Sequence, residues 1–172
     1  MDSTVSKLIL LYVFDRMGIP VTSETLNDMC CSQNNWLTYL TLTQILPELV
    51  DARFLVIISS GGTDYYKITQ EGLDCINYFF MKIPSSIRTE ITTFIKKNRQ
   101  TFQRKQEYFR DYYKNKDGSY TVNLKIIDPT GPKLELKLNV ANRAEAHAVF
   151  NKWNSSASDV YSEIYKILID GE

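Results

Sequence analysis

Residues 41–82 read TLTQILPELVDARFLVIISSGGTDYYKITQEGLDCINYFFMK, and this stretch decides the fold. Its first part, 41–52, has apolar residues at spacings of three and four, which predicts a helix with one buried face. Pro47 lies inside this pattern and lacks a backbone N–H, so we expect it either to kink the helix or to shift its start.

A β-hairpin and a further helix are predicted in the rest of this stretch. Residues 54–59 are rich in β-branched side chains, a turn follows at Gly61 and Gly62, and residues 65–68 form the returning strand. Thr69 is a good N-cap for the helix that ends the stretch.

Two helices and a short extended segment are predicted ahead of it. The first helix covers 3–17 and ends at Gly18, because the residue after a helix commonly adopts the left-handed backbone conformation that glycine favours. Residues 19–21 are extended, and a second helix follows over 23–31. Helix, strand, helix, helix, hairpin and helix is the element order of a winged helix-turn-helix, which we therefore expect over residues 1–84.

The rest of the chain, 85–172, is predicted to be an α-β-β-α extension for dimerisation or regulation. A long amphipathic helix is expected over 85–116, and two alternating strands over 120–126 and 134–140 form a two-stranded antiparallel hairpin. Asn142 begins a capping box ahead of a C-terminal amphipathic helix. The fold class is therefore α+β.

Composition argues against an enzyme. With one histidine, His147, the chain has no two-histidine metal site of its own, and His147, near the start of the last helix beside Glu145, is expected to be a surface residue. Cys30, Cys31 and Cys75 lack zinc-ligand spacing and are expected to be small core residues. No glycine-rich phosphate loop is present. We expect no catalytic residue, no metal and no cofactor.

No membrane segment is expected. The apolar run LILLYVF at 8–14 is too short to span a bilayer, and it lacks the basic flank of a signal peptide. A buried first helix accounts for it. Together with the three unpaired thiols, this favours a cytoplasmic location.

Double-stranded DNA is the expected partner, because the second helix of a helix-turn-helix enters the major groove. In this sequence that helix and its approach offer uncharged polar side chains, and the hairpin offers one cation. The candidate DNA-binding residues are Tyr39, Thr41, Thr43, Gln44 and Lys67.

Charge leaves a second interpretation open. Residues 1–84 carry five basic and nine acidic side chains, a net charge of −4, whereas 85–118 carry nine basic and four acidic, a net charge of +5. Neutralisation of phosphates by Lys and Arg supplies much of the affinity of a protein for DNA. Residues 1–84 alone are therefore expected to bind DNA poorly. A protein-interaction module without DNA contact is therefore the alternative function. The candidate auxiliary phosphate contacts are Lys96, Lys97, Arg99 and Arg104, unless this basic run is simply a solvated face.

Surplus apolar surface predicts a homodimer. The first helix contains the uninterrupted apolar run 8–14, and the helix over 85–116 is longer than one small core requires. The aromatic residues at 108–120 fit a core or dimer contact better than a stacking platform for bases. A small-molecule effector is left open.

Two resemblances accompany these patterns. The segments ILPELVDARFL and YYKITQEGLDCI resemble the winged helix of small bacterial regulators of the PadR and MarR kind. Nearly the whole chain resembles an uncharacterised bacterial family, domain of unknown function 4364, through VSKLILLYVFDRMGIP, KIPSSIRTEI, QEYFRDYY, SYTVNLKIIDP and the Trp-containing last helix. The resemblance implies a winged-helix fold with an extension, a transcriptional regulator, and no assigned catalytic residue.

Overall fold

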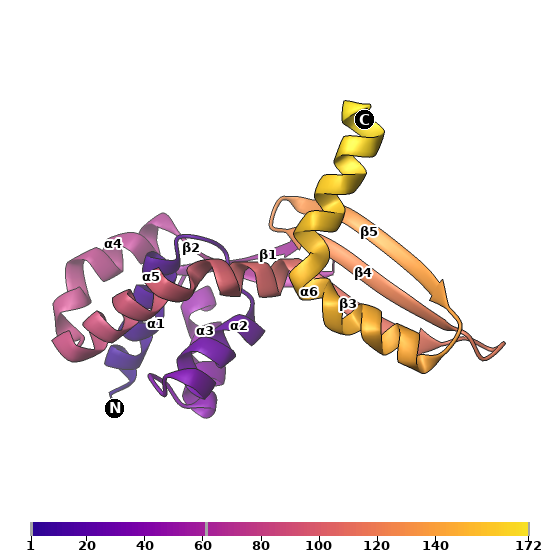
Figure 1. Ribbon diagram of the computed structural model, residues 1–172. Helices are drawn as coiled ribbons and strands as arrows, with labels where there is room; N and C mark the ends of the chain where they lie inside the picture. Colours follow the sequence, from indigo (N-terminus) through magenta and orange to yellow (C-terminus); the bar gives the residue numbers. More distant parts are fainter. Residues whose placement is uncertain (1, 61, 172) are drawn as a thin grey trace. The chain divides into compact units, whose positions relative to one another are not determined.

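The structure, a computed structural model, describes residues 2–60 and 62–171. It is α+β, as the sequence predicts, with helices and two separate antiparallel sheets (Figure 1). The chain divides into two compact units, Met1–Gln103 and Arg104–Glu172, each with its own hydrophobic cluster. The division falls inside helix α5 (Ser85–Glu107), whereas we expected a boundary ahead of this helix.

Helix α1 (Ser3–Met17) is the centre of the first unit. The four consecutive side chains from Leu8 to Leu11 are at most 5% exposed, so this part of the helix is buried on nearly every side. Gly18 ends α1 at φ 68°, and its N–H donates to the carbonyl of Phe14, as the sequence predicts.

The second helix differs from the prediction at its end. α2 (Ser23–Asn27) is capped by the Thr22 side chain and then widens into a π-helical segment, Asp28–Gln33. The Asn34 side-chain amide donates to the Met29 carbonyl at 2.9 Å. This bond closes the wider turn, and Met29, Cys30 and Cys31 all face the core.

Helix α3 (Tyr39–Asp51) begins two residues before the predicted start, because the Thr38 side chain caps it. Its buried face is Leu42, Ile45, Leu46 and Leu49. The helix continues through Pro47, whose ring is exposed. Proline there removes the donor for one carbonyl of the preceding turn, so α3 tolerates one lost backbone hydrogen bond.

The predicted hairpin is confirmed as β1 (Leu55–Ser60) and β2 (Thr63–Ile68), which pair antiparallel. Gly61, one of the two predicted turn residues, lies outside the described residues, and Gly62 has φ 81°. Val21 exchanges two backbone hydrogen bonds with Tyr66, at 2.9 and 2.8 Å. The extended segment predicted ahead of α2 thus lies along the hairpin.

Thr69 joins the hairpin, α3 and the next helix. Its side chain caps α4 (Gln70–Phe79), as predicted, and its hydroxyl donates to the carbonyl of Arg53 at 2.7 Å. A single 3₁₀ turn, Phe80–Lys82, ends this helix.

Most of α5 packs on the first unit. Tyr12 and Thr92 share a hydroxyl hydrogen bond of 3.0 Å, and the Trp36 indole N–H donates to Glu90 at 3.3 Å. Near the C-terminal end of α1, the Arg99 guanidinium donates to the Arg16 carbonyl at 2.5 Å. These contacts fix α5 against α1 and the approach to α3.

The second unit corrects the predicted extension. The long helix ends at Glu107 rather than near residue 116, and residues 108–114 are a strand. The predicted two-stranded hairpin is therefore a three-stranded sheet, and the extension is α-β-β-β-α. Its strands, in sheet order, are β3 (Tyr108–Lys114), β4 (Tyr120–Asp128) and β5 (Gly131–Val140).

Helix α6 (Arg143–Tyr165) covers one face of this sheet (Figure 1). The predicted N-cap is confirmed, since Asn142 accepts from the Glu145 backbone N–H at 3.0 Å. The Glu145 carboxylate accepts from the Ala141 N–H at 3.0 Å, one residue ahead of the N-cap N–H that a capping box uses. Trp153 lies at the centre of the unit's core with Val122 and is 3% exposed.

Among the described residues no helix is both long enough and apolar enough to cross a membrane. All three cysteines are free; Cys30 and Cys31 are buried, and Cys75 is half-buried. Burial raises the pKa of each thiol, so each stays protonated at neutral pH.

Candidate nucleic-acid interface

The N-terminal end of α3 presents an uncharged polar surface. Tyr39 is 60% exposed, and Thr43 and Gln44 are exposed. The Thr43 hydroxyl already donates to the Leu40 carbonyl at 2.9 Å, and Thr41 is half-buried with its hydroxyl bonded to Thr38 at 2.8 Å.

Gln44 differs from the two threonines. Its side-chain amide has no hydrogen-bond partner among the residues that the structure describes. A free glutamine amide has both a donor and an acceptor, and these match the major-groove edge of adenine. Gln44 is therefore the best-placed side chain of α3 for contact with a base edge.

The hairpin carries one exposed cation. Lys67 lies on β2 opposite Val56 and has no ion pair among the described residues. On β1, Val56 and Ile57 are 44% and 43% exposed, so the hairpin surface is partly apolar. The Asp64 carboxylate near the tip accepts from Ser59 at 2.5 Å.

A cationic cluster lies where α5 crosses the end of α1. Lys96 and Arg99 line a polar hollow there together with Arg16. The Arg16 guanidinium donates to Asp15 at 2.7 Å, and this hydrogen bond raises the pKa of Arg16. Arg16 was not predicted, because nothing in its sequence neighbourhood indicates that residue 96 folds beside it.

Three of the four predicted phosphate-contact residues lie in the first unit: Lys96, Lys97 and Arg99, all exposed. Arg104 is also exposed but is the first residue of the second unit. Arg99 has a structural role as well, since it holds the last turn of α1.

The position of α5 changes the charge of the proposed DNA-contacting unit. Residues 1–103 hold nine basic and ten acidic side chains, a net charge of −1, against −4 for residues 1–84. Glu48, one of the two acidic residues of α3, forms an ion pair with Lys7 at 2.8 Å. Repulsion of phosphate is therefore weaker than the sequence of the first 84 residues suggests.

The aromatic residues of β3 divide between two faces. Tyr108 lies 6.5 Å from Trp153 and Tyr112 lies 5.4 Å from Phe150 between ring centroids, so both belong to the core of the second unit. Phe109 and Tyr113 are 43% and 48% exposed. The expectation of a core contact is confirmed for the first pair.

The remaining candidate for ligand or metal binding is the single histidine. His147 is exposed on α6 and lies 3.2 Å from the Asn151 amide, as expected of a surface residue. Within 2–60 and 62–171, no three His, Cys, Asp or Glu side chains gather as a metal site.

These observations define an α+β protein of two units, the first with an exposed polar helix end followed by a hairpin. The chain belongs to the family described as Domain of unknown function (DUF4364), whose profile matches residues 6–168. Neither a curated protein nor a solved structure matches the chain significantly. The family membership confirms one of the two resemblances drawn from the sequence.

Proposed function

We propose that this protein is a cytoplasmic, DNA-binding transcriptional regulator of the winged-helix type that acts as a homodimer. In this proposal α2 and α3 form the helix-turn-helix, and β1 with β2 is the wing. The observation that carries it is the exposed N-terminal end of α3, with Tyr39, Thr43 and Gln44 facing outward and the hairpin following directly. The likeness to regulators of the PadR and MarR kind belongs to the same proposal.

Each surface has a distinct role in this mechanism. The N-terminal residues of a recognition helix contact base edges, so Gln44 reads sequence and Tyr39 and Thr43 position the helix. Lys67 on the wing and the cations of α5 neutralise phosphates without reading sequence. A homodimer would place two such helices on paired half-sites.

Fluorescence anisotropy with a random-sequence duplex tests DNA binding. We expect a saturable signal whose affinity falls steeply between low and moderate salt, because bound phosphates release counterions. If the titration gives no salt-sensitive signal, the protein does not bind DNA through phosphates and the proposal is wrong.

The double variant Lys96→Gln and Lys97→Gln tests the α5 cations. Each lost phosphate contact lowers the slope of log affinity against log salt by about 0.9, so the pair should lower it by about 2 and leave the fold unchanged. The matched control is Lys137→Gln with Lys152→Gln, which removes two exposed charges from the second unit. Equal slopes for the two variants would exclude the α5 cations as phosphate contacts.

The homodimer has its own test. Ile167, Leu168 and Ile169, at the end of the chain's last helical segment, are 60%, 76% and 64% exposed, which is unusual for three large apolar residues in one turn. Light scattering at micromolar concentration should give twice the chain mass of 19.9 kDa. A monomer mass contradicts the dimer.

One observation favours a second candidate, a protein-interaction module. Apolar side chains are exposed both at the start of α3 and on β1: Tyr39, Leu40, Val56 and Ile57. Interfaces between proteins are rich in such residues and poor in charge at their centres. A chain that dimerises but shows no salt-sensitive DNA signal would support this candidate.

A further inference from the structure

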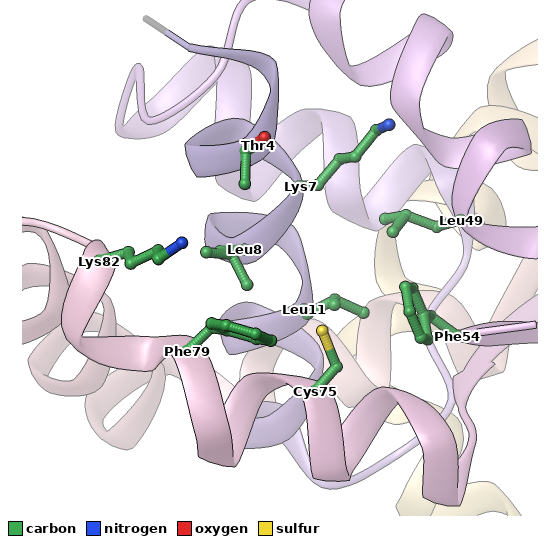
Figure 2. A pocket seen from close by; sticks show the side chains of 9 residues that line it. All are labelled: Thr4, Lys7, Leu8, Leu11, Leu49, Phe54, Cys75, Phe79 and Lys82. Atoms are coloured by element: carbon green, nitrogen blue, oxygen red, sulfur yellow. The ribbon is translucent and has the colours of Figure 1, made fainter. Parts of the chain in front are cut away.

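The first unit has an apolar hollow of about 200 Å³, open to solvent, between α1 and α4 (Figure 2). Leu8 and Leu11 of α1 line it, with Phe79 of α4 beside Leu8 at one end and Phe54 beside Leu11 at the other (Figure 2). At this size it is smaller than the sites of drug-sized molecules, about 300–1,000 Å³, and suits a smaller ligand. The walls alone would accept any apolar group of suitable shape.

The charges at this hollow are of one sign. Both charged residues that line it are lysines, Lys7 and Lys82, although residues 1–84 hold only five basic side chains against nine acidic ones. Two of the five cations of this acidic region therefore gather at its apolar hollow, which is charge complementarity for an anion.

The two lysines are not equivalent. The Lys7 ammonium is neutralised by Glu48 at 2.8 Å. The Lys82 ammonium lies 5.0 Å from the centre of the Phe79 ring and has no ion pair among the described residues. Lys82 is thus an unneutralised cation beside an apolar wall, available to a carboxylate whose chain lies in the hollow.

We propose that this hollow binds a small amphiphilic carboxylate, with its aliphatic chain between Leu8, Leu11 and Phe79 and its carboxylate at Lys82. Burial of the chain supplies most of the affinity, because each methylene removed from water contributes about 0.8 kcal/mol. The cation selects a carboxylate over a neutral or cationic head group of the same chain length. This site does not depend on DNA binding.

Cys75 provides a reporter inside the proposed site. Its side chain lines the hollow, and its sulfur is directed toward Leu11 (Figure 2). Cys75 is half-buried, whereas Cys30 and Cys31 are buried. A bound aliphatic chain should therefore slow alkylation of Cys75 and leave the other two thiols unchanged.

The experiment measures N-ethylmaleimide modification of each cysteine by peptide mass spectrometry, in the full chain, with decanoate as the probe. We expect decanoate to slow the modification of Cys75 several-fold, and this protection to saturate as the decanoate concentration rises. Decanol or decylamine at the same concentration should protect Cys75 much less. Lys82→Gln should weaken the decanoate effect about tenfold, the usual size of one charge-assisted contact. The matched control Lys67→Gln removes an exposed cation on β2 and should leave it unchanged.

Several results would overturn the proposal: no protection of Cys75 by decanoate, equal protection by decylamine, or equal decanoate affinity in Lys82→Gln and Lys67→Gln. Parallel slowing of all three cysteines would also overturn it, because that reports a change of the whole unit. If the protein binds decanoate here but does not bind DNA, the proposed ligand site is supported and only the proposed regulator function is wrong.

Discussion

Replacing Trp153 with alanine is expected to destabilise the second unit by about 3–5 kcal/mol, the cost of a large aromatic cavity. Trp153 is 3% exposed and contacts the sheet through Tyr108, whose ring centroid lies 6.5 Å away. Small domains have total stabilities of about 5–15 kcal/mol, so this single change removes much of the stability of the unit. Urea unfolding followed by far-ultraviolet circular dichroism measures it.

The phenylalanine variant at the same position gives a sharper comparison. The indole Nε1 of Trp153 is buried and has no hydrogen-bond partner among the residues that the structure describes, and an unpaired buried N–H costs stability. Trp153→Phe keeps an aromatic ring and removes that N–H, so we expect it to lose only about 1 kcal/mol. A loss as large as that of the alanine variant would show that the indole N–H makes a stabilising bond.

Gly72→Ala in α4 should have the second largest effect on stability. Alanine in place of glycine normally stabilises a helix by about 1 kcal/mol. Here a Cβ would lie 2.7 Å from the Ile68 Cγ1 atom and closer still to the backbone oxygen of Phe54. That oxygen also accepts from the Thr69 N–H at 3.0 Å, so it has little freedom to move.

We therefore expect Gly72→Ala to destabilise the first unit by about 2–3 kcal/mol, as overpacking against fixed atoms does. The control is Asn77→Ala, an exposed position on the same helix, which should be neutral or slightly stabilising. Thermal unfolding of the two variants beside the wild type measures both. A higher melting temperature for Gly72→Ala would mean that α4 does not approach the hairpin this closely.

Local signals in the sequence predicted several helix ends, in the first unit and in the second. Gly18, Thr69 and Asn142 each determine a helix end through their own backbone or side-chain chemistry, and each does so in the structure. The hairpin was readable for the same reason, since its β-branched residues and glycine turn lie within a few positions of one another.

The strand β3 was not predicted because its inward face is interrupted by a charge. Tyr108, Arg110 and Tyr112 lie on the partly buried side of the strand. Because an arginine stands between the two tyrosines, the sequence does not show the alternation of apolar and polar residues that predicts a strand. The Arg110 guanidinium lies 4.2 Å from the Phe150 ring centroid and donates to the Phe150 carbonyl at 2.7 Å. This tertiary contact explains how a charged residue serves as part of the core face.

The candidate site was predictable in part. The exposed positions of Tyr39, Thr43 and Gln44 follow from the helical period of α3, because its apolar residues fix which side is buried. The meeting of Arg16 with Lys96 was not predictable, since only the packing of α5 on α1 brings them together. The same holds for Lys7 and Lys82 at the apolar hollow.

The central claim is that the N-terminal end of α3 contacts duplex DNA, and backbone amide NMR of the labelled protein tests it most directly. On titration with a random-sequence duplex at low salt, we predict that the amide shifts concentrate at residues 39–44, Lys67 and 96–99. Absent shifts, or shifts confined to residues 104–171, would contradict the claim.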